Sequence, residues 1–278
     1  MSPGVPIQQY LRVLTIAGSD SGGGAGIQAD LKTFAALGCF GLSAITALTA
    51  QNTQGVAGIH APPPEFLATQ IDTVLDDIGV HAVKIGMLHA EPIVEVVAAA
   101  IDRHRLSRVV LDPVMVSASG APLIEPPAVR ALVAELFPRV QLITPNLDEA
   151  ALLLGRPVST AADMPAAAQA LLALGARAVL LKGGHLPGEQ VHDVLLQPGA
   201  EPLTLHAPRV PTRNLHGAGC TLSSAVAAFL AQDMPLVSAV QAAHGYVLQA
   251  IHAGARVKTG QGLGPLNHGF APRATLLR

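Results

Sequence analysis

The chain has 278 residues, enough for one large α/β domain; half of them are hydrophobic and only 13% are charged. This composition predicts a large buried core. The net charge of −2 and the lack of a long basic run argue against a nucleic-acid partner. Two cysteines, Cys39 and Cys220, need no disulfide, and residues 1–10 lack the basic and apolar regions of a secretory signal. We therefore expect a cytoplasmic protein.

Two long uncharged runs, 33–64 and 234–255, could be mistaken for membrane segments. Glycine, glutamine and asparagine interrupt the first run, and glutamine and histidine recur at roughly helical spacing in the second. Both are typical of buried elements of a soluble protein, so we expect no membrane partner.

Short apolar runs alternate with helical segments along the whole chain. The predicted strands are 12–17, 43–50, 81–85, 108–111, 140–144, 178–181, 192–196 and 203–206. The predicted helices are 27–37, 64–78, 91–104, 126–137, 147–154, one to 174 capped by Asp163, and two that fill 222–253. This alternation predicts a mostly parallel sheet covered by helices on both faces. No linker or internal repeat divides the chain, so we expect a single domain, 1–278.

Polar and glycine residues gather directly after the predicted strands. They include Gly18, Asp20, Gln51, Asn52, Met87, Asp112, Asn146 and Lys182. Ligands of open α/β sheets bind at the carboxyl ends of the strands. The sequence therefore predicts a ligand site along that edge.

The stretch 214–224 places Gly217, Ala218 and Gly219 before a long uncharged helix. The first amides of a helix lack internal partners, and glycines let a ligand approach the backbone closely, which suits an anion. Cys220 would lie at this helix N-terminus, where the pKa of a thiol is lowered. The alternative is a tight turn before a core helix, with Cys220 as a small buried residue.

Three other features each allow a functional and a structural interpretation. Asn146 and Glu149 have the spacing of a capping box, or could face magnesium and phosphate. Lys182 could neutralise phosphate charge or be a surface lysine with a buried stem. The glycine run 22–26 could be a flexible turn or a contact for phosphate or substrate. The sequence contains no P-loop and no G-x-G-x-x-G motif.

Taken together, the ordered motifs resemble the hydroxymethylpyrimidine/phosphomethylpyrimidine kinases of thiamine biosynthesis, within the ribokinase-like superfamily. The motifs that carry the resemblance are 15–20, 23–33, 44–53, 84–88, 111–115, 144–149, 182–185, 216–221 and 264–268. The resemblance implies a ribokinase-like three-layer α/β sandwich. It also implies ATP and Mg²⁺ as cofactors, and a small pyrimidine alcohol that is phosphorylated first to the monophosphate and then to the diphosphate.

The resemblance also implies roles for particular residues. The pyrimidine would be bound by Gln51 together with Gly18, Asp30, Met87, Val114 and Met115. Catalysis would involve Lys182, the anion hole at Gly217 and Gly219, and Cys220, which stands where related sugar kinases carry an aspartate base. The nucleotide would contact Asn146, Glu149, Lys182 and Ala218, and Asp112 and Glu149 would bind Mg²⁺. A homodimer is expected from the fold. A pyridoxal/pyridoxine kinase and a non-catalytic vitamin-binding relative are the alternatives.

Overall fold

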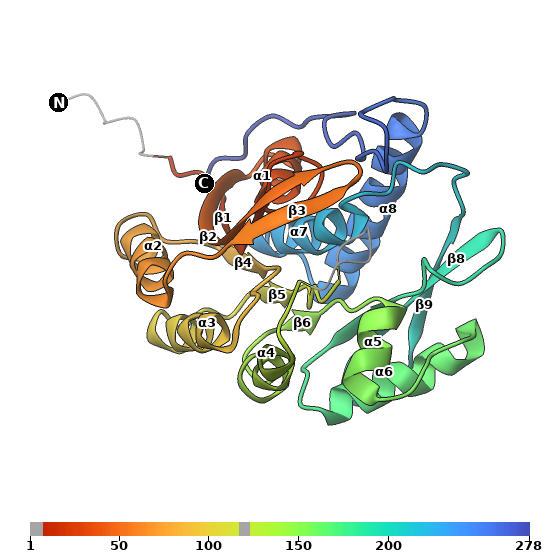
Figure 1. Ribbon diagram of the computed structural model, residues 1–278, viewed down its shortest axis with the longest axis horizontal. Coiled ribbons are helices and arrows are strands. Elements are labelled where there is room, and N and C mark those ends of the chain that lie inside the picture. The colour runs from red at the N-terminus through yellow and green to blue at the C-terminus, as the bar shows by residue number, and fades with distance from the viewer. Residues whose placement is uncertain (1–7, 117–122) are drawn as a thin grey trace.

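The computed structural model describes residues 8–116 and 123–278, and within them nine strands form one sheet (Figure 1). The strand order is β3-β2-β1-β4-β5-β6-β7-β8-β9. The six strands from β2 to β7 in this order are parallel, and β3, β8 and β9 pair antiparallel at the two edges. The strands are β1 Arg12–Asp20, β2 Phe40–Asn52, β3 Gly55–His60, β4 Ala82–Ile85, β5 Val109–Leu111, β6 Leu142–Ile143, β7 Val179–Lys182, β8 Gln190–Leu196 and β9 Leu203–Pro208.

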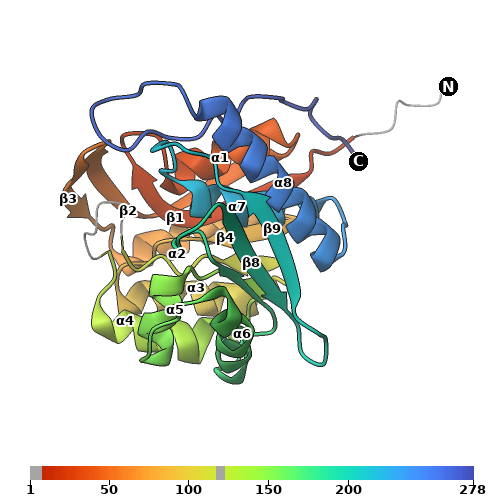
Figure 2. The ribbon, with the colours of Figure 1, turned by 90° about the vertical axis from the view of Figure 1, so that its right-hand side faces the viewer.

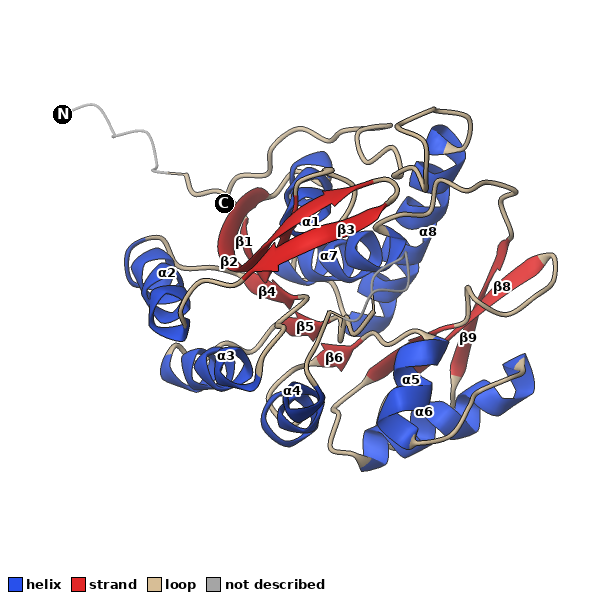
Figure 3. Ribbon diagram, in the orientation of Figure 1, coloured by secondary structure: helices blue, strands red, loops and turns tan. Residues whose placement is uncertain are grey.

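Helices cover both faces of this sheet, as expected for parallel strands that are apolar throughout. In Figure 3, β4, β5 and β6 pass between two groups of helices. One group packs α2 Pro64–Asp77, α3 Glu91–Arg103, α4 Pro126–Ala131, α5 Leu147–Leu154 and α6 Met164–Ala173. The other packs α1 Gly26–Ala36, α7 Ala218–Ala231 and α8 Leu236–Gly254 (Figure 2). The predicted three-layer α/β sandwich is confirmed.

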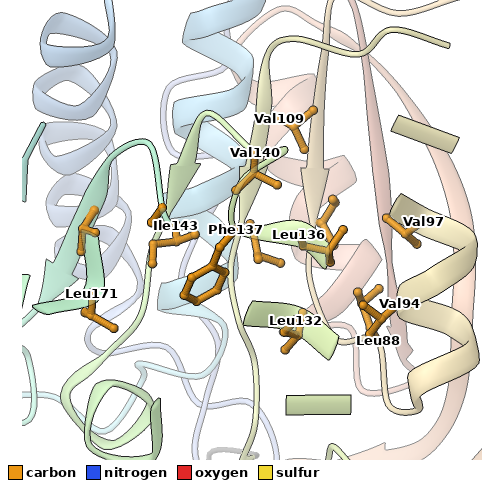
Figure 4. Packing of buried hydrophobic residues seen from close by; sticks show 14 of the residues in the cluster. Leu88, Val94, Val97, Val109, Leu132, Leu136, Phe137, Val140, Ile143 and Leu171 are labelled. Atoms are coloured by element: carbon orange, nitrogen blue, oxygen red, sulfur yellow. The ribbon is translucent and has the colours of Figure 1, made fainter. Parts of the chain in front are cut away.

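Each face of the sheet has its own hydrophobic core. On the face of α2 to α6, Phe137, Leu136, Val140 and Ile143 belong to one buried cluster, part of which is shown in Figure 4. On the other face α7 is buried along most of its length, with Phe229 2% exposed. A helix so enclosed cannot shift easily. Its N-terminus is therefore fixed relative to the strand ends.

The structure differs from the sequence prediction in three elements. The predicted strand 43–50 is longer in the structure and extends over Phe40–Asn52. A turn connects it to β3, which was not predicted because its residues are mostly exposed. The predicted helix 126–137 contains a π-helical turn over Leu132–Leu136. Asp163 does not cap α6 with its side chain; it belongs to a 3₁₀ turn, Ala161–Asp163, that Thr160 caps. None of the helices in residues 8–116 and 123–278 combines the length and hydropathy that a membrane-spanning segment requires.

Candidate active site

Two adjoining cavities open at the carboxyl edge of the sheet. The large cavity has a volume of about 660 Å³ and is lined by the ends of β1, β2 and β7, the loops after β4, β5 and β6, and the start of α7. The small cavity, of about 270 Å³, lies among β8, β9 and α8. The two cavities share Asn146, Lys182, His185, Leu215, Ala218 and Gly219. The predicted site at the strand ends is therefore a continuous pair of cavities.

The start of α7 has the geometry of an anion site. Gly217 has a φ of 83°, and a Cβ there would lie 1.9 Å from the carbonyl oxygen of Gly24, so only glycine fits. The amide of Ala218 donates to Leu215, but within the described residues the amides of Gly219 and Cys220 have no acceptor. Both residues line the large cavity. Two free amides at a helix N-terminus favour a negatively charged ligand.

Lys182 lies beside these amides and is held by a buried carboxylate. Its Nζ donates to Asp112 Oδ1 at 2.7 Å, and the hydroxyl of Thr144 donates to the same oxygen at 3.0 Å. A Cβ at Gly219 would lie 3.0 Å from the Nζ, so glycine lets the helix approach the ammonium closely. Burial lowers the pKa of Lys182, but the carboxylates of Asp112 and Glu149 outweigh it and raise the pKa. Lys182 is thus a charged, largely buried group and not a surface lysine.

Asn146 and Glu149 form the capping box of α5. The Glu149 amide donates to Asn146 Oδ1 at 2.9 Å, and Glu149 Oε2 accepts from the Asn146 amide at 2.7 Å. Burial raises the pKa of Glu149 to about 7; Lys182 opposes this shift and Asp112 adds to it. The structural interpretation of this motif is confirmed, and both side chains still line the large cavity.

Two carboxyl groups in the large cavity, those of Asp112 and Glu149, are the candidate ligands for Mg²⁺. No group of three His, Cys, Asp or Glu side chains among the described residues is arranged to hold a metal ion. Asp112 and Glu149 nevertheless line one cavity, and the negative charge of Asp112 contributes to the raised pKa of Glu149. Mg²⁺ usually takes one or two carboxylates and completes its shell with water and phosphate oxygens. The two carboxylates therefore fit this ion.

Cys220 does not have the lowered thiol pKa that its helix position predicts. It is half-buried and lines the large cavity. Burial raises the pKa of its thiol to about 11, although the ammonium of Lys84 opposes the shift. Loss of hydration outweighs the favourable helix terminus, so the thiol is protonated at neutral pH.

Asp30 does not line the large cavity. It is fully buried, and its carboxylate accepts hydrogen bonds from Thr15 at 2.6 Å, Ser224 at 2.7 Å and the Lys84 ammonium at 2.8 Å. Asp30 is not among the residues that line the large cavity, whereas its partner Lys84 is. Asp30 therefore holds Lys84 in place, and its contact with the pyrimidine stays a prediction.

Met115 likewise does not line the large cavity. Its side chain is 1% exposed and packs in the core on the face of α2 to α6. Its neighbour Val114 lines the large cavity together with the other expected pyrimidine contacts, Gly18, Gln51 and Met87.

The glycine run is organised by Asp20 and His216, whose partnership the sequence did not reveal. The Asp20 carboxylate accepts from the amides of Gly22 at 2.8 Å, Gly24 at 3.0 Å and Ala25 at 2.9 Å. His216 Nε2 lies 2.9 Å from the same carboxylate. Burial raises the pKa of Asp20, but the bonds from His216 and these amides outweigh it and lower the pKa. An aspartate two and four residues before glycines is the signal that could have predicted this loop.

The small cavity was also not predicted, because no motif marks it. Its walls include the apolar side chains of Val191, Val247 and Leu248, with Asp193 and His244 as polar groups. The Asp193 Oδ1 accepts from the amide of Gly183 at 2.9 Å, which fixes the loop after β7. An apolar slot with few polar groups is typical of small-molecule sites.

The chain is similar to known proteins over most of its length. A family model described as phosphomethylpyrimidine kinase matches residues 20–267. The chain belongs to the phosphomethylpyrimidine kinase family. A hydroxymethylpyrimidine/phosphomethylpyrimidine kinase of Rhizobium meliloti is 50% identical to this family member over 92% of this chain and 96% of its own length. The resemblance found in the sequence is confirmed.

Solved structures confirm the fold of this family member. A phosphomethylpyrimidine kinase of Clostridium difficile is 40% identical, with a TM-score of 0.76 over 87% of this chain and 99% of that one. A Bacillus subtilis pyridoxal kinase, solved as an ADP complex, is 38% identical, with a TM-score of 0.86 over 94% of this chain and 98% of that one. The fold is therefore shared by kinases that act on different vitamin precursors, so the fold alone does not identify the acceptor.

Proposed function

We propose that this kinase transfers phosphate from ATP to 4-amino-5-hydroxymethyl-2-methylpyrimidine and then to the resulting monophosphate, in thiamine biosynthesis. The main support for this proposal is that Gln51, Lys182 and the free amides of Gly219 and Cys220 all line the same cavity. Family membership supports the reaction. In this proposal Gln51 marks the end of the cavity that binds the ring, and the free amides with Lys182 mark the end that binds phosphate.

Gln51 is proposed to recognise the pyrimidine ring by hydrogen bonds. Its Oε1 accepts from the hydroxyl of Thr49 at 3.2 Å, and its Nε2 lies 3.4 Å from His216 Nε2. An amide offers one donor and one acceptor side by side, which matches a ring nitrogen and its exocyclic amine. Glycine at position 18 lets the Met87 side chain pack close to the backbone, because a Cβ there would lie 3.1 Å from the sulfur of Met87.

The phosphate end acts by positioning and by charge. We place the transferred phosphoryl group at the amides of Gly219 and Cys220, with Lys182 as the cation that stabilises its developing charge. The adenosine part of ATP would occupy the small cavity, next to Asn146 and Ala218. Asp112 and Glu149 would hold Mg²⁺, which when bound neutralises phosphate charge.

Cys220 is the proposed acceptor of the proton from the alcohol. A protonated thiol can serve only through its small thiolate fraction. A loose transition state needs little deprotonation before transfer, so a weakly populated base is compatible with the reaction.

A pyridoxal kinase is the second candidate, favoured by the TM-score of 0.86 to the Bacillus subtilis enzyme. A coupled assay of ADP release with hydroxymethylpyrimidine, pyridoxal and ribose separates the candidates. We expect the highest kcat/KM with the pyrimidine and none above background with ribose. A higher kcat/KM with pyridoxal would overturn the proposal in favour of the second candidate.

We also propose a homodimer and a cytoplasmic location. Support for the dimer comes from the β2–β3 ribbon, which leaves Leu48 47% and Ile59 36% exposed. Exposed apolar side chains on a sheet edge favour an interface. Sedimentation velocity of the wild type and of Leu48→Glu would test this: the variant should be monomeric.

A further inference from the structure

The basic side chains that line the large cavity differ in whether a carboxylate lies next to them. Four of them are paired, namely Lys84 with Asp30, Lys182 with Asp112, His185 with Asp148 and His216 with Asp20. Arg213 also lines this cavity, is exposed, and has no ion pair or side-chain hydrogen bond within the described part of the chain. Its guanidinium is therefore available to a ligand.

The backbone on both sides of Arg213 is firmly anchored. Thr212 Oγ1 donates to the carbonyl of Ala255 at 2.9 Å, and Asn214 Nδ2 donates to the carbonyls of Gly254 and Val257, each at 2.7 Å. These bonds tie the segment between β9 and α7 to the end of α8. Because the backbone is already fixed, the Arg213 side chain can bind a ligand without the entropy cost of ordering a loop.

Arg213 lines the large cavity and not the small one. The large cavity contains Gln51 and the free amides of Gly219 and Cys220, so in the proposed site it holds the acceptor and the group in transfer, whereas the small cavity holds adenosine. Lys182 lines both cavities and is already bonded to Asp112. Arg213 therefore lies away from the proposed adenosine site and is unpaired among the described residues, whereas Lys182 lies where the donor and acceptor cavities meet.

The two acceptors differ chiefly in charge. The alcohol is neutral, whereas a phosphate monoester carries about −1.5 to −2 at pH 7. Burying this charge requires a cation that is not already neutralised. A guanidinium binds phosphate oxygens in a bidentate manner, with stronger hydrogen bonds than neutral donors make.

We propose that Arg213 binds the phosphate of the monophosphate acceptor and so enables the second phosphorylation. In that step a monophosphate oxygen bonds to the γ-phosphorus of ATP, and the bond to the β,γ-bridging oxygen breaks. ADP leaves with the electron pair. The dianionic acceptor has no proton to lose. The inference rests on the proposed function.

The test compares Arg213→Gln and Arg213→Lys with the wild type. For Arg213→Gln, the ratio of kcat/KM for the alcohol to kcat/KM for the monophosphate should rise about tenfold to a hundredfold, the loss of a charged hydrogen-bonding partner. Calorimetric titration without nucleotide should show a similar weakening of Kd for the monophosphate. Arg213→Lys keeps the positive charge, so its kcat/KM and its affinity for the monophosphate should fall less than those of Arg213→Gln. Arg177→Gln is the matched control, because Arg177 is exposed and precedes β7 at the opposite edge of the sheet.

Each contrary result has its own meaning. An equal loss with both acceptors, together with a raised KM for ATP, would assign Arg213 to the donor phosphates and overturn the proposal. An unchanged ratio and an unchanged Kd would also overturn it. A wild type that phosphorylates neither pyrimidine would instead overturn the proposed function, and this inference would fall with it.

Discussion

At the scale of single residues, Gln51 is proposed to determine which acceptor is phosphorylated. Gln51→Leu removes both hydrogen-bonding ends and leaves ring groups unpaired, at a cost of about 1–3 kcal/mol. The KM of the pyrimidine alcohol should therefore rise roughly 5-fold to 150-fold, while the KM of ATP stays unchanged. Gln54→Leu is the control, since Gln54 is exposed in the turn between β2 and β3. An unchanged pyrimidine KM in Gln51→Leu would remove Gln51 from the site.

Lys182 forms an ion pair with Asp112 and is proposed to stabilise the charge of the phosphoryl group in transfer. Lys182→Ala should lower kcat by about 10²–10³, as for loss of one preorganised charge-stabilising donor. It should also lower Tm, because Asp112 is 2% exposed and would be left without its counter-ion.

A double variant separates the two roles of Lys182. Adding Asp112→Asn removes the unpaired charge and should recover part of the Tm but none of the kcat. Recovery of turnover in the double variant would show that Lys182 acts only through folding. Steady-state kinetics and differential scanning calorimetry on both variants supply the comparison.

The raised pKa of Cys220 sets the direction of its pH dependence. With a pKa of about 11, roughly one thiol in ten thousand is ionised at pH 7, and the fraction rises about tenfold per pH unit. Alkylation by iodoacetamide should therefore be slow at neutral pH and accelerate as the pH rises. Cys220→Ser, which retains only the buried Cys39, is the control. Fast labelling of Cys220 at neutral pH would contradict the burial argument.

The base role of Cys220 is tested by comparing the two acceptors. Cys220→Ala should lower kcat with the alcohol by about 10²–10⁴, the usual share of general acid–base catalysis. The loss with the monophosphate should be much smaller, because its phosphate oxygen needs no base. Equal losses with both acceptors would assign Cys220 to packing or to binding.

At the scale of elements, the glycine loop between β1 and α1 depends on Asp20. Asp20→Asn leaves one carbonyl oxygen for the three amides and His216, and should destabilise the protein by about 1–3 kcal/mol near neutral pH. Because folding lowers the pKa of Asp20, its stabilisation is complete above the pKa of an unfolded aspartate, about 4, and is lost as the pH falls further.

The urea-unfolding difference between wild type and Asp20→Asn should therefore shrink as the pH is lowered from about 6 to about 3. Asp77→Asn, at the exposed end of α2, should show almost no difference at any pH. A difference that stays constant with pH would mean that the carboxylate charge contributes nothing to the loop.

How far the elements could be predicted depends on their burial. β1 and β4 are apolar runs with buried strand centres, and α5 carries a capping box, so sequence patterns located them. β3 has mostly exposed residues and gives no apolar pattern. The resemblance implies that Asp30 and Met115 contact the ligand, but the direction of a side chain, which determines whether it lines the cavity, cannot be predicted from a motif. Asp30 points to Lys84, and Met115 points into the core.

At the scale of the whole molecule, the parallel topology accounts for the site. Six parallel strands bring Gly18, Gln51, Met87, Asp112 and Lys182 to one edge, although they lie far apart in sequence. The sequence could therefore predict the edge. It could not predict the small cavity, because that depends on how α8 packs against β8 and β9. The single domain over 1–278 stays a prediction.

The most direct measurement counts ADP and identifies the phosphorylated product when limiting hydroxymethylpyrimidine is incubated with excess ATP. Phosphorus-31 NMR distinguishes a monophosphate from a diphosphate, and a coupled assay counts ADP. We predict about two ADP released per pyrimidine, with the diphosphate as the final product and pyridoxal turned over less efficiently in a parallel reaction. A reaction that stops at one ADP and the monophosphate, or one in which pyridoxal is the better acceptor, would contradict the account.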